Sequence, residues 1–196
     1  QFVKIKKLWF EKYVNIKNKK KAFFYNKKFN MKKFEKKIGY NISKDQKFIE
    51  YSSVGIQYLQ TLSKIIKENN GGLLIIDYGY FEKKMRDTLR AISNHKYTNI
   101  LEDFGKTDIT HNINFYLFKK ILHKIGGLKN MMTSQGKFLV KMGIKKRAEM
   151  ISQNKNFSKK ADIYFRLKRL IDEKYMGNIF KVMFIKKQTN NYKLGF

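Results

Sequence analysis

The chain has 196 residues, of which 42% are hydrophobic and 15% aromatic; this composition excludes a disordered chain and suits one domain or a large part of one. Cysteine is absent, which excludes a disulfide framework, a thiolate nucleophile and a cysteine-based zinc site. The 3 histidines are too scattered for a metal motif, and no apolar run has the length of a membrane-spanning helix. We therefore expect no metal and no membrane partner.

The formal net charge of +29 would suit a nucleic-acid partner, because basic chains attract phosphate. Only five of the 44 basic residues are arginine, however, and arginine is the residue that nucleic-acid recognition favours for its planar, bidentate side chain. Proline is absent, and Lys, Asn, Ile, Phe and Tyr, whose codons are AT-rich, abound. We therefore favour codon bias over a nucleic-acid surface as the origin of the charge.

The acidic residues are more informative than the basic ones. Residues 77–108 hold six of the 15 carboxylates, together with six basic residues, and are electrically neutral, whereas residues 1–50 carry 16 lysines against four acids. A segment that keeps its acids in so basic a chain is a candidate site of chemistry. The alternative is that solvated loops hold these acids by chance. The six acids are Asp77, Glu82, Asp87, Glu102, Asp103 and Asp108.

The first fifty residues predict a β-rich, lysine-rich meander. Three β-prone runs, at 2–5, 8–16 and 22–25, are separated by clusters of lysine and asparagine, which is typical of antiparallel strands. Residues 27–48 are lysine-rich and have little hydrophobic pattern, so we expect a solvated loop there.

A helix is predicted to begin at Ser52 or Ser53 and to end at residues 69–72, where two asparagines and two glycines tolerate a left-handed turn. Between these ends apolar residues recur with helical spacing, at Tyr58, Leu59, Leu62, Ile65 and Ile66.

The continuous apolar run Leu73–Ile76 follows this helix and predicts a strand buried on both faces of a parallel sheet. In open α/β sheets the ligand crevice lies at the carboxyl ends of the strands, so Asp77 and Tyr78 are candidate site residues. Gly79 is expected to let the chain turn sharply. The alternative is a buried strand that ends in an ordinary polar turn.

The rest of the chain predicts an α/β fold. Residues 80–114 should be mostly loop and short helix, and three helices should follow, with their apolar stripes in the core. The first should be capped by Asn114 and the second by Thr133 or Ser134, and the third should run from about Ser158. Residues 179–185 predict a strand that returns to the sheet, and residues 187–196 a loose tail. The predicted domains are therefore 1–50, 51–186 and the tail.

Five motifs stand in order between residues 71 and 182. They are GGLLIIDYGY at 71–80, DTLRA at 87–91 with His95, DITHNINF at 108–115, TSQGKFL at 133–139 with MGI at 142–144 and Arg147, and Met176-Gly177 with FKV at 180–182. In this order and spacing they resemble the MidA family of S-adenosylmethionine-dependent methyltransferases. That family includes the mitochondrial protein-arginine methyltransferase that acts in complex I assembly.

The resemblance implies the C-terminal half of a class I Rossmann-like methyltransferase, with an incomplete sheet next to the N-terminal β meander. The family's glycine-rich cofactor loop is missing, so the cofactor-binding residues are unknown, and we expect the chain alone to be inactive. Because it begins with Gln1 and not Met, we interpret it as a fragment. Leu73–Ile76, as the fifth strand, would have an unpaired apolar edge. The family's usual Asp at position 114 is Asn here, and both residues cap helices well.

The resemblance also implies site residues. A protein arginine is cationic in water, so carboxylates must orient its guanidinium and favour loss of a proton before the methyl group is accepted. The residues implied to be catalytic are Asp77, Tyr78, Asp87 and Asp108, with Tyr78 packing on the acceptor or the cofactor. The residues implied to support the substrate loop are Gly79, Arg90, His95 and Thr110.

The implied cofactor of the complete enzyme is S-adenosylmethionine, and the implied substrate is a protein. The partner of this chain would be the missing N-terminal half or a homodimer mate. The implied compartment is the bacterial cytoplasm or the mitochondrial matrix. Two alternatives stay open: a non-catalytic fragment or degenerate paralogue that folds only with a partner chain, and a basic RNA-associated protein.

Overall fold

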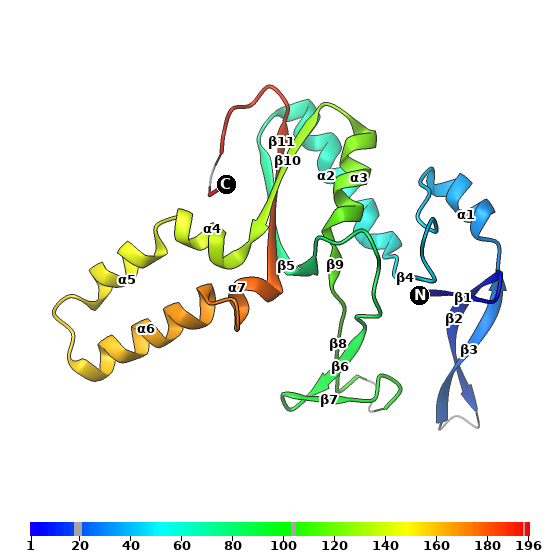
Figure 1. Cartoon of the computed structure of the whole chain (residues 1–196), viewed down its shortest axis with the longest axis horizontal. Coiled ribbons are helices and arrows are strands. Elements are labelled where there is room, and N and C mark those ends of the chain that lie inside the picture. Colours follow the sequence, from blue (N-terminus) through cyan, green and yellow to red (C-terminus); the bar gives the residue numbers. More distant parts are fainter. Residues whose placement is uncertain (18–20, 103–104, 194) are drawn as a thin grey trace. The chain divides into compact units, whose positions relative to one another are not determined.

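The computed structural model describes residues 1–17, 21–102, 105–193 and 195–196 (Figure 1). The chain divides into two compact units, which are described separately. Unit 1 comprises Gln1–Ser53 and Glu82–Asn112, and unit 2 comprises Val54–Phe81 and Ile113–Phe196. This division differs from the predicted boundaries, because residues 82–112 join the N-terminal segment. Asp103, one of the six acids noted in the sequence, lies outside the described residues.

Unit 1 contains the predicted antiparallel meander. Its strands are β1 (Phe2–Ile5), β2 (Leu8–Lys17), β3 (Lys21–Phe29) and β4 (Phe48–Ile49), and they lie in the order β3-β2-β1-β4. Every neighbouring pair is antiparallel, which confirms the strand prediction for this segment.

The solvated loop predicted at residues 27–48 is wrong, because β3 extends to Phe29 and helix α1 (Met31–Ile38) follows it. Asn30 caps α1 by accepting a hydrogen bond from the Lys33 amide, and Gly39 ends the helix in the left-handed conformation. The Phe34 ring packs on the rings of Phe2 and Phe29, with centroids 5.3 and 5.5 Å apart. Tertiary packing therefore supports a helix that the lysines concealed.

A second small sheet in unit 1 replaces most of the loop predicted after residue 80. Its strands are β6 (Arg90–Ser93), β7 (Lys96–Thr98) and β8 (Asp108–Thr110), in the antiparallel order β7-β6-β8. The short helix predicted here is absent from the described residues of 82–112. Asn94 and His95, both at positive φ, form the two-residue turn between β6 and β7, as twisted hairpins require.

Unit 2 begins with helix α2 (Ser53–Asn69), whose two ends agree with the prediction. Its buried residues are Ile56, Leu59, Ser63 and Ile66. Of the five apolar positions noted for their helical spacing, Leu59 and Ile66 are buried. The helix also carries an exposed apolar stripe, which consists of Val54, Tyr58, Leu62 and Ile65.

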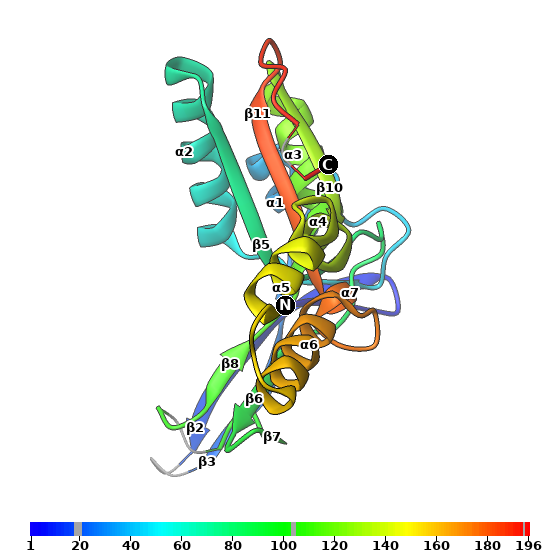
Figure 2. The same cartoon turned by 90° about the vertical axis from the view of Figure 1, so that its left-hand side faces the viewer.

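The sheet of unit 2 consists of β10 (Leu128–Ser134), β11 (Phe180–Lys187), β5 (Gly72–Tyr80) and β9 (Ile113–Asn114), in the order β10-β11-β5-β9. β11 is antiparallel to both its neighbours, and only the pair β5–β9 is parallel. The predicted return of the last strand to the sheet is confirmed, and Figure 2 shows β11 beside β5. β10 was not predicted, because its sequence LKNMMTS has no clear alternation.

Three predictions for β5 are wrong. The strand does not end at Ile76 but continues to Tyr80, so Asp77 and Tyr78 lie within it. It is not buried on both faces: Leu74, Ile76 and Tyr78 are 40%, 43% and 42% exposed. Gly79 makes no turn; a Cβ there would meet the Phe115 ring at 2.5 Å, so close packing requires the glycine. β11 pairs with residues 72–78, whereas β9 reaches only Gly79 and Tyr80 on the other edge.

Helix α3 (Phe115–Ile125) begins as predicted, with the Asn114 side chain accepting a hydrogen bond from the Leu117 amide at 2.9 Å. Asparagine thus serves as the cap at this position. Phe115 and Ile121 on α3 are fully buried, as are Val182 and Ile185 on β11, and these side chains form the centre of the core of unit 2.

The remaining helices of unit 2 are α4 (Gln135–Lys141), α5 (Ile144–Ser152), α6 (Phe157–Ile171) and α7 (Met176–Ile179). α5 was not predicted. α6 begins at Phe157, which agrees with the predicted start at about Ser158, and Asn156 is its N-cap. The expectation that the α6 stripe is core is also wrong, because no residue of α6 is buried and Leu167 and Ile171 are only half-buried.

The loose tail predicted after residue 186 is contradicted by its contacts. The Lys186 side chain is 2% exposed, and its Nζ donates hydrogen bonds to the carbonyl oxygens of Asn190 and Tyr192. The Phe196 ring packs against those of Phe138 and Phe184. These contacts fasten the described part of the tail onto unit 2.

Candidate functional site

Asp77 and Tyr78, two of the three predicted site residues on β5, lie on opposite faces of the strand. Asp77 is exposed, and its Oδ1 accepts a hydrogen bond from the Tyr78 amide at 2.7 Å. The Tyr78 ring packs against the Phe180 ring of β11, with centroids 4.1 Å apart and the ring planes tilted by 34°. Because successive residues of a strand face opposite sides of the sheet, the Asp77 carboxylate and the Tyr78 ring point away from each other. A ligand on one face of β5 would therefore contact one of the two side chains.

A cluster of hydrogen-bonded carboxylates lies in unit 1, and its centre is a residue that the sequence analysis missed. Glu50 directly follows β4 and is half-buried. Its carboxylate accepts hydrogen bonds from Gln1 Nε2 at 2.6 Å, from the Thr88 hydroxyl at 2.5 Å and from the Thr88 amide at 3.2 Å. Thr88 Oγ1 in turn accepts from the Asn112 amide at 2.9 Å.

Asp87 is the second carboxylate of this cluster. Gln1 Nε2 also donates to Asp87 Oδ1, at 2.9 Å, so one amide group bridges the two acids. Asp87 further pairs with Lys12 at 3.9 Å and with Arg90 at 4.0 Å. We call Gln1, Glu50, Asp87 and Thr88 the Glu50–Asp87 cluster. Its two carboxylates converge on a single NH₂ group, an arrangement that suits a planar, multiply donating cation such as guanidinium.

The other predicted residues of unit 1 lie on the small β6–β8 sheet. Arg90 is opposite Thr110 in the strand register, and Asp108 is opposite Ile92, two pairs further along. Asp108 and Thr110 are exposed. His95 is also exposed, at the turn between β6 and β7.

The predicted site residues thus divide between the two units. In unit 1 the ion pair of Asp87 with Arg90, and the register of Arg90 with Thr110, bring three of them near one another. The predicted residues of β5, at positions 77–79, belong to unit 2.

One sequence signal points to Glu50 in retrospect. Residues 1–50 hold only four acids among 16 lysines, and each of the four has a defined partner. Glu35 accepts hydrogen bonds from two backbone amides, Glu11 from the Tyr13 hydroxyl, and Asp45 pairs with Lys83. Scarce acids in a lysine-rich segment therefore marked structural or functional positions here.

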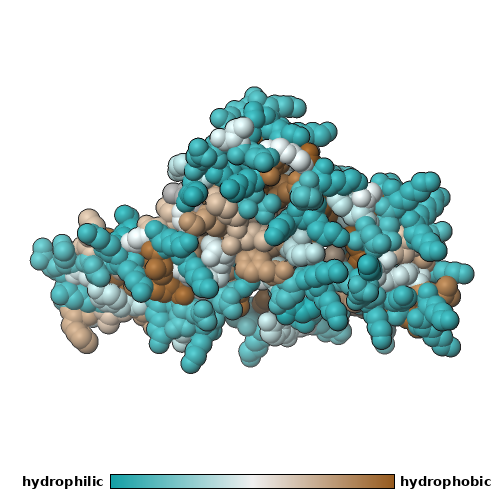
Figure 3. All heavy atoms as spheres, turned by 45° about the horizontal axis from the view of Figure 1, so that its top comes forward, coloured by the Kyte–Doolittle hydropathy of each residue, from teal (hydrophilic) through white to brown (hydrophobic). Residues whose placement is uncertain are grey.

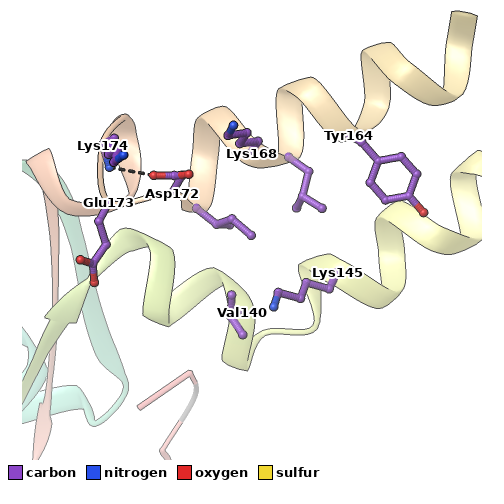
Figure 4. Close-up of a pocket in the computed structure, with 9 residues that line it drawn as sticks. Val140, Lys145, Tyr164, Lys168, Asp172, Glu173 and Lys174 are labelled. Carbon is purple, nitrogen blue, oxygen red and sulfur yellow. Dashed lines mark hydrogen bonds between the residues drawn. The ribbon is translucent and has the colours of Figure 1, made fainter.

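Across the described residues, no group of three or more histidine and acidic side chains is placed to hold a metal ion. The described helices also include none that is both long and apolar enough to cross a membrane. A hollow of about 800 Å³ lies between α4, α5 and α6 in unit 2 (Figure 4), and none of the predicted site residues lines it.

Comparison with known proteins supplies the family. Residues 1–133 match the model of a family described as "Putative S-adenosyl-L-methionine-dependent methyltransferase". The mitochondrial protein arginine methyltransferase NDUFAF7 of Danio rerio is 29% identical over 142 residues, which are 71% of this chain and 33% of that protein. The Drosophila melanogaster homologue is 29% identical over 136 residues, which are 69% of this chain and 31% of that protein.

Two crystal structures from Burkholderia thailandensis share the fold. One, solved with bound S-adenosyl-homocysteine, has a TM-score of 0.80 at 20% identity and aligns with 100% of this chain and 51% of its own. The other, an uncharacterized protein, has a TM-score of 0.79 at 22% identity, with 99% and 53% coverage. The chain therefore spans about a third of the length of the relatives and half that of the solved structures. Because the family match covers residues 1–133, this chain belongs to that S-adenosyl-L-methionine-dependent methyltransferase family.

Proposed function

We propose that the chain supplies the C-terminal half of a class I Rossmann-like domain that methylates arginine in a protein, as in complex I assembly. The family match over residues 1–133 carries the proposal, and the two relatives named as protein arginine methyltransferases support the choice of acceptor. The bacterial cytoplasm and the mitochondrial matrix are the two compartments that suit it, and the mitochondrial relatives favour the second.

The open edge of β5 supports the idea of a half-domain. From Gly72 to Tyr78 this strand has β11 on one edge and no strand neighbour on the other among the described residues. Leu74 and Ile76 expose apolar surface beside that edge, and an apolar strand with unpaired backbone groups favours pairing with a further strand. The occupant we propose is a parallel strand from the remaining half of the domain; a homodimer mate is the competing occupant.

S-adenosylmethionine, the proposed cofactor, supplies an electrophilic methyl group on a sulfonium centre. The described residues fit only part of such a site. The exposed Tyr78 ring, held by Phe180, offers a flat surface for a planar or cationic group. The glycine-rich cofactor loop would come from the other half of the domain.

The Glu50–Asp87 cluster is the proposed holder of the acceptor guanidinium. An arginine side chain stays protonated in neutral water, so methyl transfer needs acceptors that orient its N–H groups and receive a proton. Glu50 and Asp87 already share one NH₂ donor, and a guanidinium would take the place of that amide. Asp77 and Asp108 are proposed as further catalytic carboxylates.

The supporting residues act through the loops that carry these acids. Arg90 would fix the Asp87 loop by its ion pair and by hydrogen bonds to the carbonyl oxygens of Asp87 and Leu89. Thr110 and His95 would hold the β8 and β6–β7 ends of the small sheet, and Gly79 would allow the close approach of Phe115 to β5.

The test combines this chain with the upstream half of the Danio rerio relative, expressed separately. The chain alone is expected to bind S-adenosylmethionine negligibly in calorimetry, and the mixture to bind it and to methylate an arginine peptide. Glu50→Gln should lower transfer by about 100-fold, since a positioned acid–base group contributes roughly 10²–10⁴. Glu82→Gln, which removes an exposed acid paired with Arg86, is the matched control and should retain activity.

Binding of S-adenosylmethionine by the chain alone would contradict the half-domain proposal. Unchanged transfer by the Glu50→Gln variant in an active mixture would remove the Glu50–Asp87 cluster from the acceptor site.

A further inference from the structure

A groove on unit 2 is lined by none of the residues proposed for methyl transfer. It is the hollow of about 800 Å³ between the α4–α5 segment and α6, and it opens to solvent (Figure 4). Its apolar lining comes from Val140 on α4 and from Tyr164, Leu167 and Ile171 on α6. We call this hollow the α4–α6 groove.

The helices around this groove bury little of their apolar surface. α6 has no buried residue, and α5 buries only Ala148 and Ser152. In the lining of the groove itself, Tyr164 on α6 is 45% exposed and Val140 on α4 is 40% exposed. Figure 3 shows brown apolar atoms between hydrophilic side chains at the end of the view where Figure 1 places α5 and α6. Clustered exposed apolar surface marks an interaction site more often than single exposed residues do.

The charge at the groove selects the kind of partner. Lys145 at the start of α5 and Lys168 on α6 line it from its two sides, and Figure 4 shows Lys145 and Tyr164 reaching into the space between the helices. Within the described residues neither ammonium group makes a hydrogen bond or an ion pair. α5 carries three basic residues and one acid, and α6 five basic residues and one acid. A segment that lies between these two lysines must therefore bring carboxylates.

The acids of the lining are confined to the end of the groove where the chain leaves α6. They are Asp172 and Glu173, and Asp172 Oδ1 already accepts a hydrogen bond from the Lys174 amide at 2.8 Å. Lys174 lines the same end, and Lys168 belongs to the last turn of α6, while Lys145 lines the groove from α5. An acidic segment would therefore pair with Lys145 and Lys168, because Asp172 is already engaged with its own loop.

We propose that the α4–α6 groove binds an acidic amphipathic helix of a partner protein. The apolar face of such a helix would cover Tyr164, Leu167 and Ile171, while its carboxylates would pair with Lys145 and Lys168. This is the helix-in-groove mode of recognition, in which apolar anchors supply affinity and rim charges supply selectivity. A second copy of the chain is disfavoured as occupant, because it would bring the same positive helices and a net charge of +29.

Fluorescence anisotropy with the full chain tests this proposal. The probe is a fluorescein-labelled peptide of about 18 residues, long enough for a helix, that carries leucine on one face and glutamate on the other. The comparison peptide has glutamine at every glutamate position. The acidic peptide should bind, the glutamine peptide should bind at least about tenfold more weakly, and added salt should weaken the acidic peptide.

Charge-reversal variants locate the binding. The double variant Lys145→Glu with Lys168→Glu should lower affinity for the acidic peptide by about tenfold, and circular dichroism should show unchanged helix content. The matched control, Lys146→Glu with Lys159→Glu, makes the same change of charge on the same two helices outside the groove lining, and should lower affinity by less than about threefold.

Equal losses in the two double variants would reduce the binding to general attraction by a basic chain and would overturn the proposal. So would equal affinity for the two peptides, no binding of either, or self-association of the chain that only the groove variant abolishes. The readout needs neither cofactor nor methyl transfer, so a failure here is distinct from a failure of the proposed function.

Discussion

Neighbouring strands β5 and β11 have similar apolar sequences but different environments. In β11, residues 182–186 are all buried, and Val182, Met183 and Ile185 have no exposed surface. In β5, Leu74 and Ile76 remain 40% and 43% exposed. β11 has a strand on each edge along its length, whereas β5, within the described part of the chain, gains its second neighbour only at Gly79. Strand neighbours and the helices they bring, more than hydrophobicity, decided which strand is core.

The largest expected effect on stability is the difference between truncating an isoleucine of β11 and truncating one of β5. Ile185→Ala in β11 should lower the free energy of unfolding by about 2–5 kcal/mol, because it removes a fully buried side chain and leaves a cavity. Ile76→Ala in β5 should cost less than about 1.5 kcal/mol, since that side chain already meets solvent. Urea denaturation of both variants measures the difference. Equal losses of unfolding free energy would contradict the conclusion that burial distinguishes the two strands.

At the enclosed end of β5, a larger side chain should lower the stability of the fold. Gly79→Ala is expected to cost about 1–3 kcal/mol, because the new methyl group would meet the Phe115 ring at 2.5 Å and the Ile113 carbonyl oxygen at 2.6 Å. At Gly72, the other end of the strand, a Cβ would meet the Phe184 ring at 2.6 Å, but the nearest backbone atom, the Ile185 carbonyl oxygen, only at 3.3 Å. Gly72→Ala should therefore cost less in the same denaturation assay.

Asn114, the N-cap of α3, lies beside Tyr80 at the enclosed end of β5. Asn114→Ala should cost about 1 kcal/mol through loss of the hydrogen bond from the Leu117 amide. Asn114→Asp keeps the accepting oxygen, removes the buried Nδ2 that has no partner among the described residues, and adds a negative charge at a helix N-terminus. It should equal or exceed the original protein in thermal stability; a loss as large as that of Ala would contradict the cap assignment.

A charged side chain on the open part of β5 should change self-association of the protein more than its free energy of unfolding. Ile76→Lys is expected to alter the unfolding free energy by less than about 1.5 kcal/mol, while reducing self-association through the exposed strand. Light scattering over a concentration series measures this effect. Lys187→Glu, at the end of β11, is a control charge change that should leave association as it was.

The smallest effect concerns the lysine near the end of β11. Burial, together with nearby Lys129 and Lys193, lowers the pKa of Lys186 below its ordinary value of 10.5. The unfolded chain then binds more protons than the folded one, so this group's contribution to stability rises with pH between the folded and the unfolded pKa. The thermal stability of the original protein relative to Lys186→Met should therefore increase as the pH is raised towards 10.5; a constant difference would contradict the shift.

The sequence predicted best those features that depend on neighbouring residues. The ends of α2, the Asn114 cap and the strands β1 to β3 follow from capping side chains and β-prone runs, and the structure has all of them. Prediction failed for α1, where lysines hide a helix that aromatic packing supports, and for β10, which lacks alternation. It missed Glu50, because the partners of that acid are 38 and 49 residues away along the chain.

The family, the α/β class and most helix starts could be read from the amino-acid sequence, because motifs and caps consist of adjacent residues. Folding fixed the rest: Asp77 and Tyr78 lie within a strand and face opposite ways, Gln1 joins Glu50 to Asp87, and β11 is buried while β5 is half-open. Each of these features depends on contacts between distant segments, and burial is a property of the neighbours that a strand acquires on folding.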